Sequence, residues 1–299
     1  MNNYLPEGMD PRRGGFTPEI LRKAKAEGTI LQATAVVCTE QHDLLVDLGC
    51  CLGRIPHSET AIGISEGQVR EIAILTRVGK PVSFRVLELP ANGPALLSRR
   101  LAQEEARQFL LETKMPGDIL PAVVTSLASF GAFCDVGCGV PALMGIETIS
   151  VSRIRHSRDR FREDQRIFAV IRAMDRETGR IQLSHRELLG TWAENAALFQ
   201  AGQTVTGVVR SIQDYGAFVE LTPNLSGLAE PNLDLRVGDT ISVYIKSILP
   251  DRLKIKLVAL RKLDPGSLPP RPLRYFKTCG HVSRWCYGSE NTSKTLTVF

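Results

Sequence analysis

A short aromatic phrase that occurs twice is the feature that most constrains the fold of this chain. It reads SFGAF at residues 129–133 and returns about 85 residues later as YGAF at residues 215–218. Each copy follows a strand-like run and carries two aromatic residues three positions apart around a Gly-Ala pair. Repetition at this separation predicts a chain assembled from related modules rather than one large domain.

Three such modules can be identified along the chain. Strand-like runs group into units of about 65 to 75 residues with five candidate strands each, which is typical of an OB-fold barrel. An immunoglobulin-like sandwich would need more strands. We therefore expect a mainly β protein of tandem five-stranded OB-fold barrels joined by short helical linkers. The expected divisions are an N-terminal extension with a short helix (1–26), a first barrel (27–100), a helical linker (101–116), a second barrel (117–186), a second helical linker (187–201), a third barrel (202–262) and a basic, aromatic C-terminal tail (263–299).

Helix signals support these divisions. Thr17 followed by Pro18 predicts a capped helix that ends near Glu27. Apolar residues at helical spacing predict the two linker helices over 101–114 and 187–200. In the second linker we expect Trp192 and Phe199 to pin the helix to a neighbouring barrel.

Composition supports a folded protein and gives only a weak indication of its partner. At 299 residues with 43% hydrophobic residues the chain can bury several cores, and its net charge of +5 would not by itself identify a nucleic-acid binder. The basic excess lies in the tail, where residues 265–299 hold five basic side chains and one acidic one. The sequence leaves open whether this proline-rich tail adds a strand pair or lies loose.

Several classes of function are disfavoured by what the sequence lacks. The seven cysteines form no C-x-x-C pair, so we expect no metal site. Reduced thiols, no apolar run of about 20 residues and no signal-peptide core predict a cytoplasmic protein without membrane contact. The chain also lacks a Walker-type loop, H-E-x-x-H and G-x-S-x-G, and its five histidines are dispersed. We therefore expect no enzyme activity, no catalytic residues, no cofactor and no small-molecule substrate.

The repeated aromatic residues are the candidate functional groups. Side chains alternate between the faces of an ideal strand, so two rings three positions apart point to opposite sides, and at least one could belong to a core. A glycine kink between them can instead set the rings on the outside of a barrel, where they could stack on unpaired bases. The pattern favours single-stranded nucleic acid as the ligand, with core packing as the alternative.

These residues resemble the RNA-binding domain named after small-subunit ribosomal protein one, called the S-one domain below, which is a five-stranded OB-fold. The family pattern contains Phe-Gly-Ala-Phe-Val-Asp, a Gly-Leu-hydrophobic-His turn and a closing Arg-Ile-x-Leu-Ser. In the second unit the resemblance places Phe130 and Phe133 at the stacking positions. It places Asp175 and Arg180 at the acidic and basic positions beside the fifth strand, whereas Gly145 replaces the histidine.

The other two units follow the pattern less completely. In the third unit the resemblance assigns stacking to Tyr215 and Phe218 and phosphate contacts to Arg252 or Lys254, while Glu230 stands at the histidine position.

The first unit keeps the frame of the family but not its aromatic residues. His42 and Leu45 stand where the aromatics belong, and Pro56 stands at the histidine position. The resemblance therefore implies that this barrel has lost the stacking surface.

As a whole, the resemblance implies a short, three-repeat RNA-binding protein that holds single-stranded mRNA with low sequence specificity in translation, with the small ribosomal subunit as a further candidate partner. Stacking would capture bases while Arg180, Arg210, Arg252 and Lys254 neutralise phosphates. An arginine-rich loop at 153–166 is either a phosphate contact or a solvated, self-neutralising segment. The alternative function is a protein-protein adaptor on the ribosome or in an RNA-decay or transcription complex, with little RNA affinity of its own.

Overall fold

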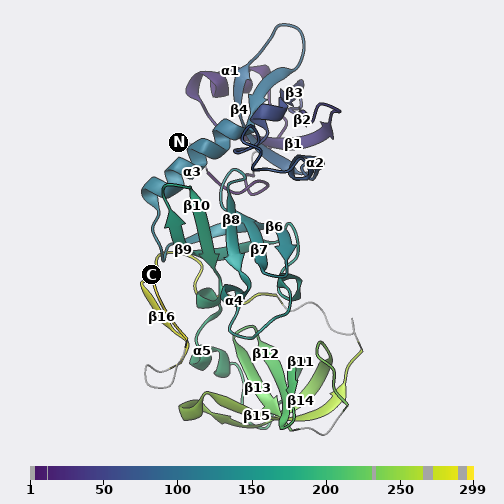
Figure 1. Cartoon of the computed structure of the whole chain (residues 1–299), viewed down its shortest axis with the longest axis vertical. Coiled ribbons are helices and arrows are strands. Elements are labelled where there is room, and N and C mark those ends of the chain that lie inside the picture. The colour runs from purple at the N-terminus through teal and green to yellow at the C-terminus, as the bar shows by residue number, and fades with distance from the viewer. Residues whose placement is uncertain (1–3, 12, 231–233, 265–271, 289–294) are drawn as a thin grey trace.

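Each of the three units closes into a five-stranded barrel, as the sequence predicts. Figure 1 shows the barrels following one another along the long axis of the molecule. The computed structural model describes residues 4–11, 13–230, 234–264, 272–288 and 295–299. Parts of the expected N-terminal extension and C-terminal tail, at 1–3, 265–271 and 289–294, lie outside the described residues.

The barrels share one strand order, in which the first three strands are followed by the fifth and then the fourth. The third and fifth strands of each barrel run parallel, and the other neighbours are antiparallel. The first barrel contains β1 (Leu31–Cys38), β2 (Leu44–Asp47), β3 (Leu52–Ile55), β4 (Pro81–Glu88) and β5 (Ala95–Ser98). The second contains β6 (Ile119–Ala128), β7 (Gly131–Asp135), β8 (Pro141–Gly145), β9 (Arg166–Asp175) and β10 (Arg180–Ser184). The third contains β11 (Thr204–Gln213), β12 (Gly216–Thr222), β13 (Leu225–Ala229), β14 (Thr240–Leu249) and β15 (Lys254–Lys262).

Alternation of apolar residues along the strands fills the interior of each barrel. In β2, for example, Leu44 and Val46 are fully buried, Leu45 is half-buried and Asp47 is exposed. Each such buried aliphatic side chain stabilises the fold by roughly 1.5–3 kcal/mol relative to exposure. Every barrel has its own apolar core, so the chain is three modules rather than one domain.

A β-bulge recurs at the same place in the first strand of every barrel. The register shifts between Ala35 and Val37 in β1, between Val124 and Ser126 in β6, and between Val209 and Ser211 in β11. After the bulge, Leu45, Phe133 and Phe218 occupy equivalent positions opposite these first strands. A bulge bends a strand and increases its twist, which helps a five-stranded sheet to close. The structure thus confirms the alignment of the three units.

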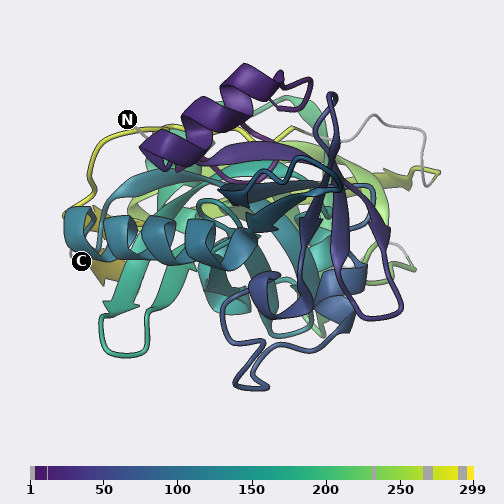
Figure 2. The same cartoon turned by 90° about the horizontal axis from the view of Figure 1, so that it is seen from above.

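Two helices pack on strand β4 of the first barrel. Helix α1 (Pro18–Glu27) begins as predicted, because the Thr17 hydroxyl accepts a hydrogen bond from the backbone N–H of Ile20. Helix α3 (Arg99–Thr113) is the first linker, and its buried face enters the core of the second barrel. Figure 2 shows α1 and α3 as two separate rods. Helix α3 therefore joins the first two barrels rather than spacing them apart.

The second linker differs from the single helix expected over 187–200. It consists of a 3₁₀ turn (Arg186–Leu189) and the short helix α5 (Trp192–Ala196). Gly190 has a φ of 84°, which interrupts the helix, and Thr191 starts a new one with a capping box. Trp192 belongs to the core of the third barrel and Phe199 packs against that core, as predicted.

The remaining helical elements are short. They are α2 (Ile72–Leu75), α4 (Ile146–Ile149) and 3₁₀ turns at His57–Glu59, Ser157–Asp159 and Pro250–Arg252. Among the described residues, none of the helices combines the length and the apolar character that crossing a bilayer requires.

The C-terminal tail adds a strand pair, one of the two outcomes that the sequence left open. Strands β16 (Arg284–Cys286) and β17 (Leu296–Val298) form an antiparallel two-stranded sheet. Trp285 packs with Val170 and Leu188 on the second barrel and its linker. The hydroxyl of Tyr287 donates to the backbone carbonyl of Asn224 in the third barrel. The tail therefore bridges two barrels.

A buried hydrogen-bond chain anchors the start of this tail. His185 lies between the carbonyl of Ile149 and the hydroxyl of Tyr275, each 3.0 Å from one ring nitrogen. Because a carbonyl only accepts, Nδ1 carries the proton and Nε2 accepts from Tyr275, whose oxygen in turn accepts from the N–H of Phe168. Burial lowers the pKa of His185 to about 4. This series of hydrogen bonds is complete only when the His185 ring is neutral.

We predict that this histidine makes the fold acid-sensitive. The unfolded chain binds a proton near pH 6.5 and the folded chain only near pH 4, so stability falls as the pH drops from 6.5 to 4. The full loss is about 3 kcal/mol. Urea unfolding followed by tryptophan fluorescence at several pH values should show this slope in the wild type and a smaller one in His185→Gln. Equal slopes in the two proteins would contradict the assignment.

Candidate nucleic-acid interface

Two matched pairs of aromatic rings stand at the surface of the second and third barrels. Phe130 is 57% exposed and Tyr215 is 63% exposed. The ring centroids of Phe130 and Phe133 lie 6.0 Å apart at 87°, and those of Tyr215 and Phe218 lie 6.3 Å apart at 86°. Phe133 is 36% exposed and Phe218 is half-buried. The two barrels thus present the same edge-to-face arrangement.

The glycine between the rings explains why both stay outside the core. Phe130 lies in the turn before β7, so ideal strand alternation does not apply to it. A Cβ at Gly131 would lie 2.2 Å from the carbonyl oxygen of Met144 on the neighbouring strand, and one at Gly216 would lie 2.3 Å from that of Ala229. Only glycine permits this approach. The core-packing alternative therefore does not describe Phe130 or its counterpart in the third barrel.

The predicted acidic and basic positions of the second barrel lie on the hairpin between β9 and β10. Asp175 and Arg180 are both exposed and directly opposite each other in the strand pairing. The carboxylate of Asp175 accepts from the hydroxyl of Thr178 at 2.5 Å and from the N–H groups of Glu177 and Thr178. These hydrogen bonds lower the pKa of Asp175, and the bond from the Thr178 hydroxyl has the largest effect. Asp175 therefore shapes the turn, and the guanidinium of Arg180 extends into solvent.

The third barrel has a basic residue at the equivalent position. Lys254 opposes Leu249 at the start of the β14–β15 hairpin, as Arg180 opposes Asp175 in the second barrel. Lys254 and the neighbouring Arg252 are exposed. Both remain candidates for phosphate contact.

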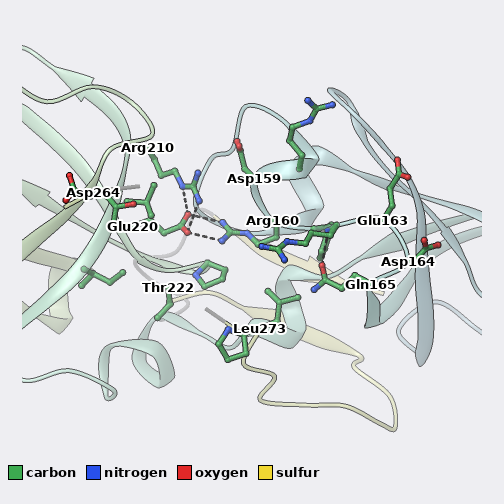
Figure 3. Close-up of a pocket in the computed structure, with 18 residues that line it drawn as sticks. Asp159, Arg160, Glu163, Asp164, Gln165, Arg210, Glu220, Thr222, Asp264 and Leu273 are labelled. Atoms are coloured by element: carbon green, nitrogen blue, oxygen red, sulfur yellow. Dashed lines mark hydrogen bonds and ion pairs between the residues drawn. The ribbon is translucent and has the colours of Figure 1, made fainter. Parts of the chain in front are cut away.

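Arg210, the fourth predicted phosphate contact, is instead part of a buried ion cluster (Figure 3). Its Nε and Nη2 atoms donate to the carboxylate of Glu220 at 2.9 and 3.1 Å. Arg160 from the second barrel donates to the same carboxylate from the other side, at 2.8 and 2.9 Å. The side chains of Arg160 and Glu220 are each 6% exposed. An RNA phosphate would have to share Arg210 with Glu220.

Both arginines act on the acidity of this carboxylate. Burial alone would raise the pKa of Glu220, but hydrogen bonds and charge from Arg160 and Arg210 outweigh it and lower the pKa. The carboxylate is therefore ionised, and it joins the second barrel to the third.

Neutral hydrogen bonds complete this joint. The backbone N–H of Val151 donates to the side-chain oxygen of Asn224 at 3.0 Å, and the amide nitrogen of Asn224 donates to the carbonyls of Arg186 and Gly190. The hydroxyls of Ser152 and Ser226 are 2.8 Å apart. These bonds join the second barrel and its linker to the third barrel, so they hold the aromatic pairs of the two barrels at a fixed separation.

The arginine-rich loop at 153–166 therefore divides between two environments. Arg160 points into the joint (Figure 3). Arg158 and Arg162 are exposed and line a groove beside it. Thr222 and Leu273 line the same groove. The exposed arginines of the loop are available to an anionic chain, whereas Arg160 is not. Asp159, Glu163 and Asp164 are also exposed and line the same groove, so the loop carries both signs of charge there.

A second buried cluster joins the first barrel to the second. Asp135, equivalent to Glu220, accepts from the backbone N–H of Glu7 at 2.6 Å and from those of Gly137 and Gly139. Glu7 also pairs with Arg99 of α3 through two hydrogen bonds of 2.7 and 2.9 Å. Burial and the nearby Glu7 charge raise the pKa of Asp135 to about 7.

Sequence reasoning missed both joints. Arg160 is one arginine among several in its loop, and Glu7 lies in a segment rich in proline and glycine. The only available signal was the acidic residue two positions after the second aromatic, at Asp135 and Glu220. This acidic residue recurs in both repeats, but base stacking by the aromatic rings gives it no role.

Comparison with known proteins agrees with these observations. Residues 113–186 match the family described as S1 RNA binding domain. The chain is 31% identical over 257 residues to small ribosomal subunit protein bS1 of Leuconostoc lactis, covering 79% of this chain and 58% of that protein. It is 30% identical to the bS1 homolog of Bacillus subtilis, covering 62% and 53%. The chain thus spans little more than half the length of these relatives.

A solved structure shows a local similarity. A chain of the a/eIF2alpha-aDim2p-rRNA complex from Pyrococcus horikoshii is 28% identical over 28% of this chain and 51% of that chain, with a TM-score of 0.25. At that score the likeness carries no argument about the arrangement of the barrels.

We predict that Glu220→Gln loosens the joint between the second and third barrels. The substitution keeps the shape but leaves two guanidinium groups without their carboxylate, which costs about 3 kcal/mol. Small-angle scattering should show a broader range of inter-barrel distances, and the third barrel should unfold separately in urea. Glu163→Gln, an exposed site in the loop that carries Arg160, is the matched control and should change neither measurement. An unchanged scattering profile in Glu220→Gln would show that the neutral bonds alone hold the joint.

Proposed function

Because the chain belongs to the S1 RNA-binding domain family, we propose that it binds single-stranded RNA with low sequence specificity, as an mRNA-binding factor in translation. The observation that carries this proposal is the matched pair of exposed aromatic rings on two consecutive barrels. Exposed rings of this size cost free energy in water unless a ligand covers them. Flat bases are ligands of the required shape.

Stacking supplies the main attraction in this mechanism. Each stacked base contributes roughly 1–3 kcal/mol, and every base has a flat face, so selectivity among sequences is low. Phe130 and Tyr215 are the principal platforms. Phe133 and Phe218, which meet them edge to face, support the platforms and cover a second base edge.

Basic groups beside the rings hold the phosphates. Arg180 in the second barrel and Arg252 and Lys254 in the third lie exposed on the closing hairpins. Arg158 and Arg162 line the groove at the joint together with Asp159, Glu163 and Asp164, so they offer individual phosphate contacts there rather than a positively charged surface. Asp175 contributes indirectly, because it fixes the turn that carries Arg180. Arg210 would contact a phosphate only by giving up one of its hydrogen bonds to Glu220.

The fixed joint lets one RNA strand engage both barrels. Once a strand is bound at the second barrel, binding at the third is intramolecular, and a rigid connection keeps the effective concentration of the second site high. We assign no catalytic role to the protein, and we place it in the cytoplasm with the small ribosomal subunit as its assembly partner. The first barrel, which lacks the rings, would contact protein or brace the array.

We predict that the Phe130→Ala/Tyr215→Ala variant loses most RNA affinity. Removing two stacking platforms should cost at least 2 kcal/mol in total, or roughly 30-fold in Kd. Fluorescence anisotropy with a short unstructured RNA should show wild-type binding that weakens as salt is raised from about 50 to 200 mM. Phe109→Ala, which removes a partly exposed ring of α3 that stacks on Tyr4, is the matched control and should bind like the wild type.

Unchanged binding in the double variant would count against stacking, and no binding in the wild type would favour the protein-protein adaptor.

We predict that the full chain sediments with purified small ribosomal subunits and brings labelled RNA with it. In the double aromatic variant the subunits should still carry the protein but not the RNA, because the two contacts use different barrels. Loss of both together would show that RNA alone mediates the association. Absence of sedimentation in the wild type would exclude the ribosomal partner.

A further inference from the structure

The first barrel has a histidine cluster at the place where the other barrels carry their aromatic rings. Leu45 faces β1 across the same register position at which Phe133 and Phe218 face their first strands. His42, three residues earlier, is therefore the counterpart of Phe130 and Tyr215. In the first barrel, the position of the missing aromatic rings is occupied by side chains that can bind a metal ion.

Three potential metal ligands meet at this position. His42 Nε2 lies 3.3 Å from Glu71 Oε2, and the rings of His42 and His57 have centroids 5.7 Å apart. One ligand atom from each of the three side chains lies within 4.8 Å of the other two. Bonds of about 2.1 Å to a tetrahedral zinc ion place ligand atoms about 3.4 Å apart. Small side-chain rotations would bring the three atoms to that spacing.

One ring nitrogen of His57, Nε2, is buried without a hydrogen-bond partner among the described residues. A buried polar atom without a partner costs roughly 1–3 kcal/mol. An ion pair between His42 and Glu71 alone would leave this cost in place, whereas a bound cation would remove it.

The backbone holds both histidines in position. The N–H of His57 donates to the carboxylate of Asp43 at 2.8 Å, and Asp43 also binds Arg54. His42 has a φ of 60°, an unusual conformation for a residue other than glycine, and its N–H donates to the carbonyl of Thr39. Residues held in sparsely populated backbone conformations cluster at binding sites.

We propose that His42, His57 and Glu71 bind a divalent transition-metal ion of the zinc class in the first barrel. Two imidazoles and one carboxylate suit zinc and its neighbours better than magnesium or calcium. The fourth position would hold water, as in other three-ligand zinc sites. Glu71 immediately precedes α2, so the ion would fasten the segment between β3 and β4 to the barrel. This site does not depend on RNA binding by the other barrels.

Cysteines are the main competing ligands in a test of this proposal. Cys50 and Cys51 are exposed with their sulfur atoms 3.9 Å apart. They lie at the turn of the β2–β3 hairpin, about four residues or roughly 13 Å from its histidine end. The full chain should therefore be studied with Cys50→Ser and Cys51→Ser as the common background.

The experiment is a titration of this background protein with Zn²⁺ in competition with a chromophoric chelator. We expect one site that His42→Ala, His57→Ala and Glu71→Gln each weaken by at least about 100-fold. Glu66→Gln, an exposed site in the same segment, and His156→Ala, in the second barrel, are the matched controls and should bind as the background does. Zn²⁺ should also raise the Tm of the background and control proteins but not of the three ligand variants.

Equal Zn²⁺ affinity in the background and the three ligand variants would overturn the proposal. So would a Co²⁺-loaded background protein that shows thiolate-to-metal charge-transfer absorption, because the metal would then sit on the remaining cysteines. Circular dichroism of each variant distinguishes loss of the site from loss of the fold. A variant that fails to fold is replaced by His42→Asn or His57→Asn, for which the same loss of affinity is required.

Discussion

The carboxylate of Glu220, buried between Arg160 and Arg210, is the interaction on which the arrangement of the second and third barrels depends. Burying one charge is costly, and two bidentate guanidinium partners are what make it tolerable. Nε of Arg160 is buried without a hydrogen-bond partner among the described residues. The cost of burying the three charges therefore offsets much of what their pairing contributes, and the cluster specifies orientation more than it adds stability. Two modules that could fold separately are thereby held as one surface.

The same position in the repeat performs this task twice. Asp135 follows Phe133 by two residues, as Glu220 follows Phe218. Asp135 accepts from Glu7 of the N-terminal extension, and Glu220 accepts from Arg160 of the second barrel. In the first barrel the equivalent Asp47 is exposed and accepts from the N–H of Gly49 in its own turn. The acidic position of the motif is thus a docking point, and its burial follows from the place of each barrel in the array.

The sequence predicted the modules well because they rest on local information. Alternating apolar residues and the glycine between Phe130 and Phe133 determine the strands, and they indicate where rings leave the core. The joints depend on contacts between segments far apart in the chain, such as Arg160 with Glu220, which no local pattern encodes. The broken second linker was missed because helical spacing around it outweighed the single Gly190. The exposed rings of Phe130 and Tyr215 could therefore be predicted from the sequence, whereas the fixed distance between the two barrels that carry them could not.

Specialisation of the first barrel follows from how an OB-fold uses its surface. The core and the bulge define the barrel, so the outward position held by Phe130 elsewhere can change without loss of the fold. Replacing a ring by His42 exchanges stacking, which needs a flat apolar face, for coordination, which needs lone pairs at short range. The neighbouring turn already supplies His57, and the long β3–β4 connection supplies Glu71. The first barrel therefore keeps the shared frame, and the metal ion that we propose for it would lie where the other two barrels present their rings.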